Sequence, residues 1–389
     1  MSSVSRLLTT HAGSLPRPDA LLELYAAGGG GEDVGHALSE AVADVVRQQC
    51  TAGIDIVGDG EFGKPTESSG EGYGHGTWLR YIRARLGGCG WAEVKDVAPI
   101  SRDRRDFPEY YRASTPDADP ASGSVGPQKV WACVGPIEYL GAAAVARDIT
   151  TLQAALGGVP VEDAFLPVAS AASIALLIPN AFYQSEEEYL VALGEAMRQE
   201  VKAIVEAGLS VQIDDPVVVG NWDYWPEEDL DGYRRYARRR VELLNDALRG
   251  VPPERIRYHV CWGSWQGPHS TDLPLRDVVD ILLDVHASGL CLECANARHE
   301  HEWRVWEDTE LPAGMVLIPG VVSHKTSVLE HPELVADRLI RYARCVGREN
   351  VVAGTDCGLG GRLSSDLVWA KLAVLSQGAQ LASQRLWPR

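Results

Sequence analysis

Four residues in the second half of the sequence carry side chains that commonly bind metal ions. His259 and Cys261 are separated by one residue in a run typical of a β-strand, so both side chains point to the same face. Glu293 closes the next strand-like run, and Cys357 lies just beyond the last one. One imidazole, two thiolates and one carboxylate form a set that suits zinc. The displaceable carboxylate is more consistent with a reactive site than with a closed structural one.

Other residues compete with this set as metal ligands. Cys291 and Cys294 form a CxxC motif, which can mark a redox pair or half of a zinc site. Because the motif lies in a strand-like run, its cysteines face opposite sides, and core packing is the preferred interpretation. His299 and His301 alternate with glutamates, a pattern typical of a solvated loop, and are the reserve ligands. The spacing of the preferred set matches no local finger pattern, so the site depends on the fold joining distant segments.

Polar residues also follow most of the other strand-like runs. The segments are His11–Ser14, Asp59–Glu61, Asp214–Pro216, Ser323–Lys325 and Asp356–Gly358. Each segment alone has a simple explanation, such as a turn or a solvated loop. Together they are expected to meet at the carboxyl ends of neighbouring strands, where burying so many unpaired polar groups would be costly. We therefore interpret them as parts of one site.

The elements that must position these residues alternate along the chain. Strands are predicted at residues 7–10, 54–57, 164–168, 211–214, 256–261, 290–293, 316–321 and 351–353. Helices are predicted at residues 34–50, 186–207, 230–248, 275–286, 332–346 and 365–382. This alternation predicts an α/β fold, a single (β/α)8 TIM-type barrel over residues 1–389, whose active site lies at the carboxyl ends of the strands. A six-stranded open sheet is the alternative that periodicity leaves open.

The alternation breaks within residues 64–158, after the second predicted strand. This stretch is rich in glycine, proline and charged residues and contains one strand-like run, at residues 129–134. It leaves from the carboxyl end of a strand, and long loops in compact domains are usually functional or disordered. We expect a large insertion that caps the barrel near its active-site mouth, and a surface loop without function is the alternative.

Composition excludes several classes of protein. Apolar residues make up 45% of the chain, which is ample for a large core, and acidic residues outnumber basic ones by 54 to 36, for a net charge of −18. That excess disfavours binding to nucleic acid and to anionic membranes. Eight cysteines are too few for a disulfide framework in 389 residues, and no signal peptide or membrane span is recognisable. We expect a cytoplasmic enzyme; the oligomeric state is left open.

At its polar motifs the chain resembles the catalytic barrel of cobalamin-independent methionine synthase. It is more similar still to the short single-barrel relatives that include epoxyalkane:coenzyme M transferase. The segments that carry the resemblance are Thr9–Pro16, Gly53–Glu61, Gln212–Pro216, His259–Gly263, Leu292–Asn296, Gly320–His324 and Gly354–Gly358. They run through most of the chain in family order, and only the stretch between Gly63 and Lys129 matches loosely.

The resemblance implies roles for individual residues. His259, Cys261, Glu293 and Cys357 fall on the zinc ligands of the family. Ser14 matches the position that holds the carboxylate of homocysteine, and His11 lies in the same substrate-binding segment. Glu61 and Asp214 match the acids that hold the amino group of homocysteine. His324 lies one residue out of register with the histidine that supplies a proton to the leaving group.

The resemblance also limits the choice of methyl donor. After its third strand the synthase has a Thr-Gly-Pro segment and a tryptophan associated with folate, whereas this chain reads Ser170–Leu177 there and has neither. The leading prediction is a zinc-dependent transferase that moves a methyl or small alkyl group from a small-molecule donor to a homocysteine-like thiol, as in methionine biosynthesis. The alternatives are an epoxide-opening thiol transferase and a lyase, hydrolase or ligand-binding barrel that transfers nothing to a thiol.

Overall fold

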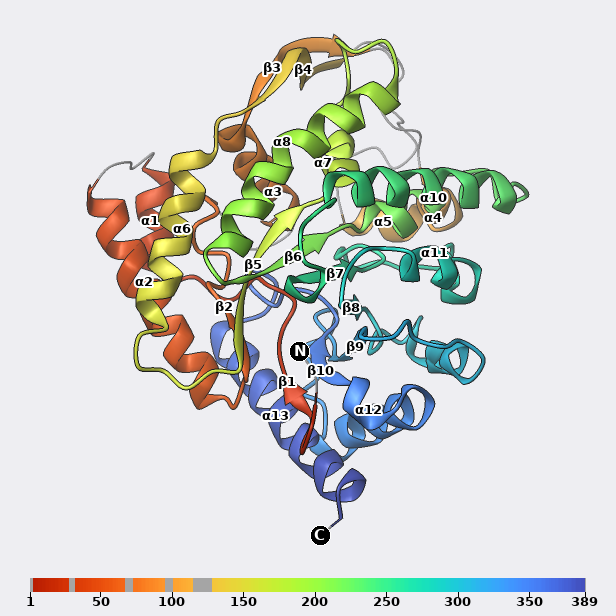
Figure 1. Cartoon of the computed structure of the whole chain (residues 1–389). Coiled ribbons are helices and arrows are strands. Elements are labelled where there is room, and N and C mark those ends of the chain that lie inside the picture. Colours follow the sequence, from red (N-terminus) through yellow and green to blue (C-terminus); the bar gives the residue numbers. More distant parts are fainter. Residues whose placement is uncertain (1–2, 28–31, 67–72, 95–100, 115–127, 389) are drawn as a thin grey trace.

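The computed structural model describes residues 3–27, 32–66, 73–94, 101–114 and 128–388 (Figure 1). Eight parallel strands form one sheet in the order β1-β10-β9-β8-β7-β6-β5-β2. Their bounds are Leu8–Thr9 for β1, Ile56–Gly58 for β2, Asp163–Ala169 for β5, Ser210–Asp214 for β6, Ile256–Val260 for β7, Gly289–Leu292 for β8, Val316–Val322 for β9 and Val352–Thr355 for β10. Each of the eight predicted strands overlaps one of these.

The two ends of the sheet meet and close it into a barrel. The backbone N–H of Asp55, just before β2, donates to the carbonyl of Thr9 in β1 at 3.1 Å. The Asp55 carboxylate accepts the Thr9 amide at 2.9 Å, which ties the same two segments together a second time. The predicted (β/α)8 TIM-type barrel is confirmed, and the six-stranded open sheet is excluded.

Helices form an outer ring around the strands (Figure 1). The ring consists of α2 (Glu32–Thr51), α6 (Ala142–Ala155), α8 (Glu186–Glu206), α10 (Leu230–Ala247), α11 (Val279–Leu283), α12 (Pro332–Val346) and α13 (Ser365–Leu386). Shorter pieces are α1 (Asp19–Ala26), α7 (Ala171–Leu177), α9 (Val217–Gly220) and 3-10 turns at Asn221–Tyr224, Pro253–Arg255, Leu275–Asp277, Glu300–Glu307 and Arg348–Asn350. Within the described residues, no helix is long and apolar enough to cross a membrane.

A small apolar cluster fills the barrel interior, separate from the main core between strands and helices. Its members are Leu8, Ile56, Phe165, Cys291, Val316, Ile318 and Val352. The Arg257 guanidinium lies 3.9 Å from the Phe165 ring centroid and donates to the Thr10 hydroxyl and the His11 carbonyl, each at 2.9 Å. Cys294 belongs to the main core, so the two cysteines of the CxxC motif face opposite sides, as predicted.

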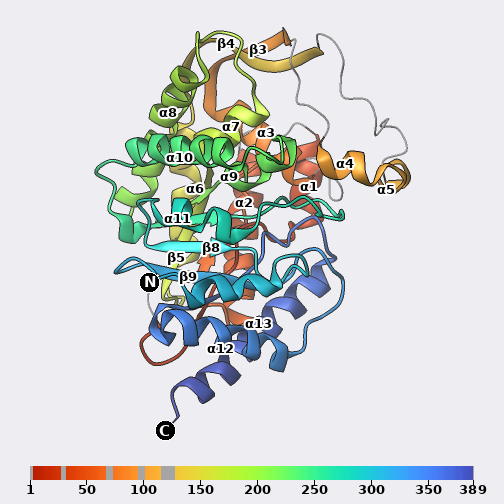
Figure 2. The same ribbon diagram turned by 90° about the vertical axis from the view of Figure 1, so that its right-hand side faces the viewer.

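An insertion separates β2 from α6. Its described elements are α3 (Tyr73–Arg85), β3 (Leu86–Val94), α4 (Arg102–Asp106), α5 (Pro108–Ser114) and β4 (Gln128–Tyr139). The strands β3 and β4 pair antiparallel as a separate ribbon, and α4 and α5 stand at one side of the molecule (Figure 2). Arg102 donates to the carbonyl of Trp222 at 2.8 Å, and the Tyr110 hydroxyl donates to that of Gln266 at 2.8 Å. These contacts bring α4 and α5 against the loops that follow β6 and β7.

A buried network of charges fastens the insertion to the helix ring. Glu200 of α8 accepts hydrogen bonds from the hydroxyls of Tyr81 at 2.6 Å and Tyr139 at 2.7 Å. Arg85 lies 3.1 Å from the Glu200 carboxylate and 2.7 Å from that of Asp148 in α6. The helix α6, which lies inside the predicted insertion of residues 64–158, contacts both α2 and α8 as a member of the ring. The network therefore joins α3 and β4 to two barrel helices.

Candidate metal centre and substrate site

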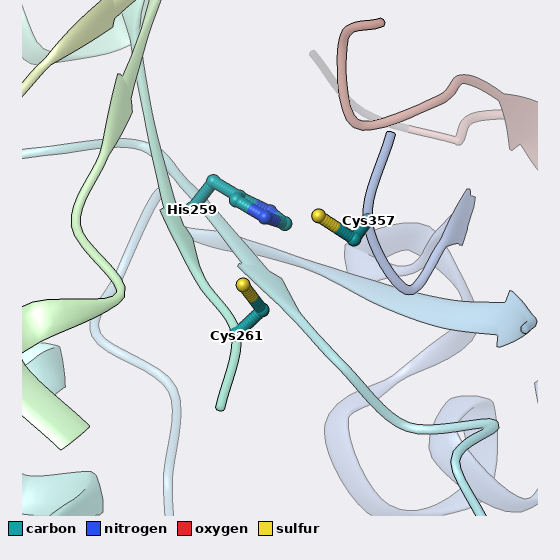
Figure 3. Close-up of side chains that lie close together, drawn as sticks. All are labelled: His259, Cys261 and Cys357. Atoms are coloured by element: carbon teal, nitrogen blue, oxygen red, sulfur yellow. The ribbon is translucent and has the colours of Figure 1, made fainter. Parts of the chain in front are cut away.

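Three of the four predicted metal ligands converge at the carboxyl end of the barrel (Figure 3). His259 belongs to β7, Cys261 follows the end of that strand, and Cys357 follows β10. One ligand atom from each residue lies within 4.8 Å of the others. His259 and Cys261 are buried and Cys357 is half-buried. The barrel thus brings together side chains from widely separated parts of the sequence, as the strand-end pattern predicted.

The chemistry of these three side chains fits a soft divalent cation. Neither ring nitrogen of buried His259 has a hydrogen-bond partner among the described residues, although unpaired buried nitrogens are costly. Contact with Cys261, followed by His259, holds the pKa of the Cys357 thiol well below its usual value. Contact with Cys357 and burial raise the pKa of Cys261, so Cys357 is the more acidic of the two thiols. A zinc ion would take the place of the thiol protons and pair with the free imidazole.

Glu293, the fourth predicted ligand, lies beside this cluster. It forms a neighbouring group with His324 and Asp356, whose ligand atoms also lie within 4.8 Å of one another. Its Oε2 accepts the backbone N–H of Trp262 at 3.0 Å, and its Oε1 lies 2.8 Å from the Lys325 ammonium. Oε1 thus has an ion-pair partner but no hydrogen bond among the described residues, and the role of Glu293 as a metal ligand stays a prediction.

His324 is buried beside Glu293 and Asp356. Neither of its ring nitrogens has a hydrogen-bond partner within the part of the chain that the structure describes. Burial lowers its pKa to about 4, against the opposing effect of Cys357 and Glu293. The ring is therefore neutral at pH 7 in this state, and its proposed role as a proton donor stays a prediction.

Asp356 lies in one of the predicted site segments, but no individual role was predicted for it. Its Oδ1 accepts the backbone N–H groups of Cys294 and Ala295, each at 2.7 Å, which fixes the chain directly after Glu293. Burial, with repulsion from Glu293, raises its pKa to about 8. Its position immediately before Cys357 was visible in the sequence, but only the fold shows that it bridges β10 to the end of β8.

The two predicted amine-binding acids, Glu61 and Asp214, are both buried. Burial raises the pKa of Asp214 to about 7; the charge of His259 opposes this rise and that of Glu61 adds to it. A Cβ on Gly13 would come 2.3 Å from the Glu61 carboxylate, so that acid lies directly over the loop after β1. Glu61 has φ of 63°, a conformation that is rare outside glycine and often found at functional sites.

Ser14 packs against the loop that follows Cys357. A Cβ on Gly358 would come 2.1 Å from the Ser14 hydroxyl, so the loop after β10 has no room for a side chain at that position. The carbonyl of Ser14 accepts the amides of Leu359 at 2.9 Å and Gly360 at 3.0 Å. Ser14 is therefore fixed beside Cys357, as a residue that binds the carboxylate of a metal-bound thiol would need to be.

His11 has less freedom to bind a substrate. Its Nε2 lies 2.8 Å from the Gln49 amide oxygen, and its Nδ1 accepts the Gly13 amide at 3.2 Å. Burial lowers its pKa to about 4, so the ring is neutral. A direct hydrogen bond to a substrate would have to replace one of these two, and its predicted substrate contact stays a prediction.

His299 is not the solvated loop residue that its sequence context predicted. Its side chain is only 3% exposed and lies between two carboxylates, with Nδ1 2.8 Å from Glu302 and Nε2 2.9 Å from Asp272. That prediction was wrong for His299. Alternating histidines and glutamates indicate a solvated loop only if the loop lies on the surface of the fold. Here the 3-10 turn at Glu300–Glu307 buries Glu302 against His299, while His301 is exposed, as predicted.

A cavity of about 460 Å³ opens next to the Glu293 group. It is lined by Tyr110 of the insertion, the loop from Gln266 to His269, the loop from Asn296 to Arg298, and Lys325. Among the described residues its charged side chains are Arg298 and Lys325, and it contains no carboxylate. A positive lining in a chain of net charge −18 favours a ligand that carries negative charge.

Asp59, which precedes the Glu61 turn, gives a testable pH dependence. Burial raises its pKa from the usual 3.8 to about 6, so the folded state holds this proton more tightly than the unfolded state does. Stability is therefore lost as the pH rises from about 4 to about 6. The free energy of unfolding in urea should rise for Asp59→Asn, relative to wild type, by about 2–3 kcal/mol between pH 4 and pH 6. The exposed Asp44→Asn serves as control, and a pH-independent difference for Asp59→Asn would contradict the expectation.

Comparison with known proteins adds relatives that match along almost the whole chain. The 2-hydroxypropyl-CoM lyase of Xanthobacter autotrophicus is 24% identical over 97% of this chain and 90% of its own length. The methionine synthase of Saccharolobus solfataricus is 25% identical over 99% of this chain and 98% of its own. No protein-family model matches the chain. The resemblance predicted from the motifs is confirmed, and the chain is similar to methyltransferase-type barrel enzymes at low identity.

Solved structures show the same fold. A B12-independent methionine synthase from a Shewanella species, in complex with selenomethionine, superposes with a TM-score of 0.72 at 22% identity and covers 98% of this chain and 99% of that one. A putative vitamin-B12-independent methionine synthase from Listeria monocytogenes gives a TM-score of 0.64 at 16% identity, over 97% and 98% of the two chains. At such identities the likeness concerns the barrel alone.

Proposed function

We propose that the protein is a zinc-dependent transferase that moves a methyl or small alkyl group to the sulfur of a homocysteine-like thiol. The observation that carries the proposal is the cluster of His259, Cys261 and Cys357, with its unpaired imidazole nitrogens. The named relatives, which include methionine synthases, support the same class of reaction. A cytoplasmic location goes with this proposal, since all eight cysteines are free thiols.

The chain's own residues divide the task of holding the metal. His259, Cys261 and Cys357 would bind it permanently, and Glu293 would be the fourth, displaceable ligand. A bound zinc ion stabilises the deprotonated sulfur of a thiol at neutral pH, where a free alkyl thiol is only slightly ionised. Two cysteine thiolates leave the site with little net positive charge, which keeps an incoming sulfur nucleophilic.

The substrate would lie between the metal cluster and the acidic pair. Glu61 and Asp214 present carboxylates for a substrate ammonium group, and Ser14 presents a hydroxyl for its carboxylate next to Cys357. These three residues approach from the loops after β2, β6 and β1, while the metal ligands come from β7 and β10. The arrangement orients an amino-acid thiol with its sulfur toward the cluster.

The alkyl donor would enter through the cavity beside Lys325. Tyr110 and Asp103 of the insertion contact its walls, and we propose that residues 64–158 act as a cap over this entrance. The donor's leaving group would then face His324, which is grouped with Glu293 and Asp356 and which we retain as the candidate proton donor. A folate donor remains disfavoured, because the family's folate-associated segment is replaced by Ser170–Leu177.

A second candidate is the opening of an epoxide by a small thiol with the same metal site. The similarity to 2-hydroxypropyl-CoM lyase over 97% of the chain favours it. The positive lining of the cavity would also suit a thiol or donor with an acidic group. The two candidates differ in the electrophile and in the need for an amine-binding acid pair.

Metal analysis followed by X-ray absorption tests the proposal. We expect about one zinc per chain and one additional zinc–sulfur contact when homocysteine is added. Thiol consumption should then be measured with methylfolate, methylated amines and epoxides as alternative donors. Full activity of a metal-free protein, or an X-ray absorption spectrum that does not change when the thiol is added, would overturn the proposed function.

The acid pair supplies a prediction about the acceptor. Glu61→Gln is expected to raise the KM for homocysteine about 10- to 100-fold, because a hydrogen bond to a charged group contributes about 1.5–3 kcal/mol. The KM for a thiol of similar size without an amino group should change little. Steady-state kinetics with both thiols checks this, and equal losses for both would show that Glu61 supports the loop instead of binding the amine.

A further inference from the structure

Lys325 connects the metal region to the donor cavity. Its ammonium lies 2.8 Å from Oε1 of Glu293 and 3.1 Å from Nε2 of His269, and its side chain lines the cavity. We propose that Lys325 competes with the metal for the Glu293 carboxylate and so keeps one coordination position accessible to an incoming thiol. This inference rests on the proposed function, because it assumes that a metal occupies the cluster.

The position of Glu293 supports this competition. Its carboxylate is fully buried, and its two oxygens have one partner each, the Trp262 amide and the Lys325 ammonium. Attraction between opposite charges is much stronger in a buried site than in water, so the contact with Lys325 lowers the carboxylate's tendency to bind a cation. A metal ion at the cluster would compete with these two partners for the Glu293 carboxylate.

A network of buried, hydrogen-bonded side chains holds Lys325 in place. His269 has Nδ1 2.9 Å from the Asp272 carboxylate, and its Nε2 lies 3.1 Å from both the Lys325 ammonium and the Trp265 carbonyl oxygen. The tautomer with its proton on Nδ1 lets Nε2 accept from Lys325. The same Asp272 oxygen lies 2.9 Å from Nε2 of His299, whose Nδ1 lies 2.8 Å from Glu302. Burial disfavours the charged imidazole, but the carboxylates of Asp272 and Glu302 outweigh it and raise the pKa of His299 to about 9.

This network also contacts Glu293 indirectly, through Trp262. The ring of His299 stacks on Trp262 at a centroid distance of 3.9 Å, and the Trp262 amide is the second partner of the Glu293 carboxylate. The loops after β7, β8 and β9 therefore form one connected unit around Glu293. Such a unit fixes the lysine, whose long side chain would otherwise be costly to immobilise.

The insertion adds a restraint on the same unit. Asp103 of α4 accepts the backbone amides of His269 at 3.3 Å and Ser270 at 3.0 Å. His269 has φ of 54°, a conformation that residues other than glycine rarely adopt and that needs support from its surroundings. Asp103 supplies that support, so the His269 ring is aimed at Lys325 by contacts made outside the barrel.

A double-mutant cycle tests the inference without relying on turnover. Lys325→Met is expected to lower the zinc dissociation constant about tenfold and to weaken homocysteine binding about tenfold, because Glu293 then stays on the metal. In a Glu293→Gln background both effects should disappear. Zinc affinity is measured by competition with a chromophoric chelator, and thiol binding by the sulfur-to-cobalt charge-transfer band of the cobalt-substituted protein. Arg298→Met, which removes a charge from the same cavity, is the matched control.

His269→Asn provides a second variant that leaves both charges of the ion pair in place. It should shift both constants in the same direction as Lys325→Met, by about threefold, because the lysine is held less firmly. Constants that change less than about twofold in Lys325→Met, or changes that persist beside Glu293→Gln, would overturn the inference. If wild-type protein itself gave no thiol-dependent cobalt band, the proposed function would fail instead.

Discussion

Replacing Cys357 by serine is expected to remove the metal. Serine is a poor ligand for zinc at neutral pH, and the loss of Cys357 leaves His259 and Cys261, both at the end of β7, without their partner from β10. Changes to groups outside the ligand shell already cost 10–100-fold in metal affinity, so loss of a ligand should cost more than about 100-fold. Zinc content after dialysis and the chelator-competition constant measure this directly.

A matched cysteine controls for oxidation and folding. Cys345 of α12 is half-buried and far from the cluster, and Cys345→Ser should keep its full zinc content. Circular dichroism of both variants checks that the barrel is intact. Retention of one tightly held zinc by Cys357→Ser would show that the three-residue cluster is not the metal site.

Replacing Arg85 by methionine is expected to cost about 3–5 kcal/mol of unfolding free energy, the usual cost of breaking a buried charge network. The side chains of Arg85 and Glu200 are 4% and 3% exposed, so loss of the guanidinium leaves the Glu200 carboxylate buried without a charged partner, whereas Asp148 keeps its ion pair with Arg147 at 2.6 Å. The Tyr81 and Tyr139 hydroxyls would remain as the only neutral partners described for Glu200. Urea unfolding monitored by tryptophan fluorescence gives the free energy.

The exposed arginine of α10 is the control. Arg239 forms surface ion pairs with Glu187 and Glu242, and Arg239→Met should leave the unfolding midpoint almost unchanged, because such pairs are screened by solvent. If Arg85→Met behaved like this control, the network would not be what fastens the insertion to the barrel.

The barrel was predictable because its strands repeat one pattern. Short apolar runs alternate with helical stretches, and this alternation identified all eight strands, including the two-residue β1. The helix α6 was missed because it lies inside the stretch assigned to the insertion, where glycine and charged residues masked its periodicity. The helix predicted at residues 275–286 is broken into a 3-10 turn and the short α11, which local periodicity does not distinguish from one helix.

The candidate site was predictable for residues whose position at the end of a predicted strand is enough to place them at the mouth of the barrel. His259, Cys261 and Cys357 follow that rule, and the structure brings them together. Lys325 and Asp356 stood in the same strand-end segments, but their partners come from other strands, and pairing across strands leaves no local signal. His269 and Asp272 were not singled out at all, because they lie well beyond the end of β7 in a loop whose course depends on the insertion.

The metal cluster joins the end of β7 to the loop after β10, and this has a consequence for biogenesis. A growing polypeptide leaves the ribosome from its N-terminus, so His259 and Cys261 emerge long before Cys357 does. Until β10 has docked between β9 and β1, only part of the ligand set exists. An ion held by this cluster, as proposed, would therefore find its complete ligand set only after the last strand is in place.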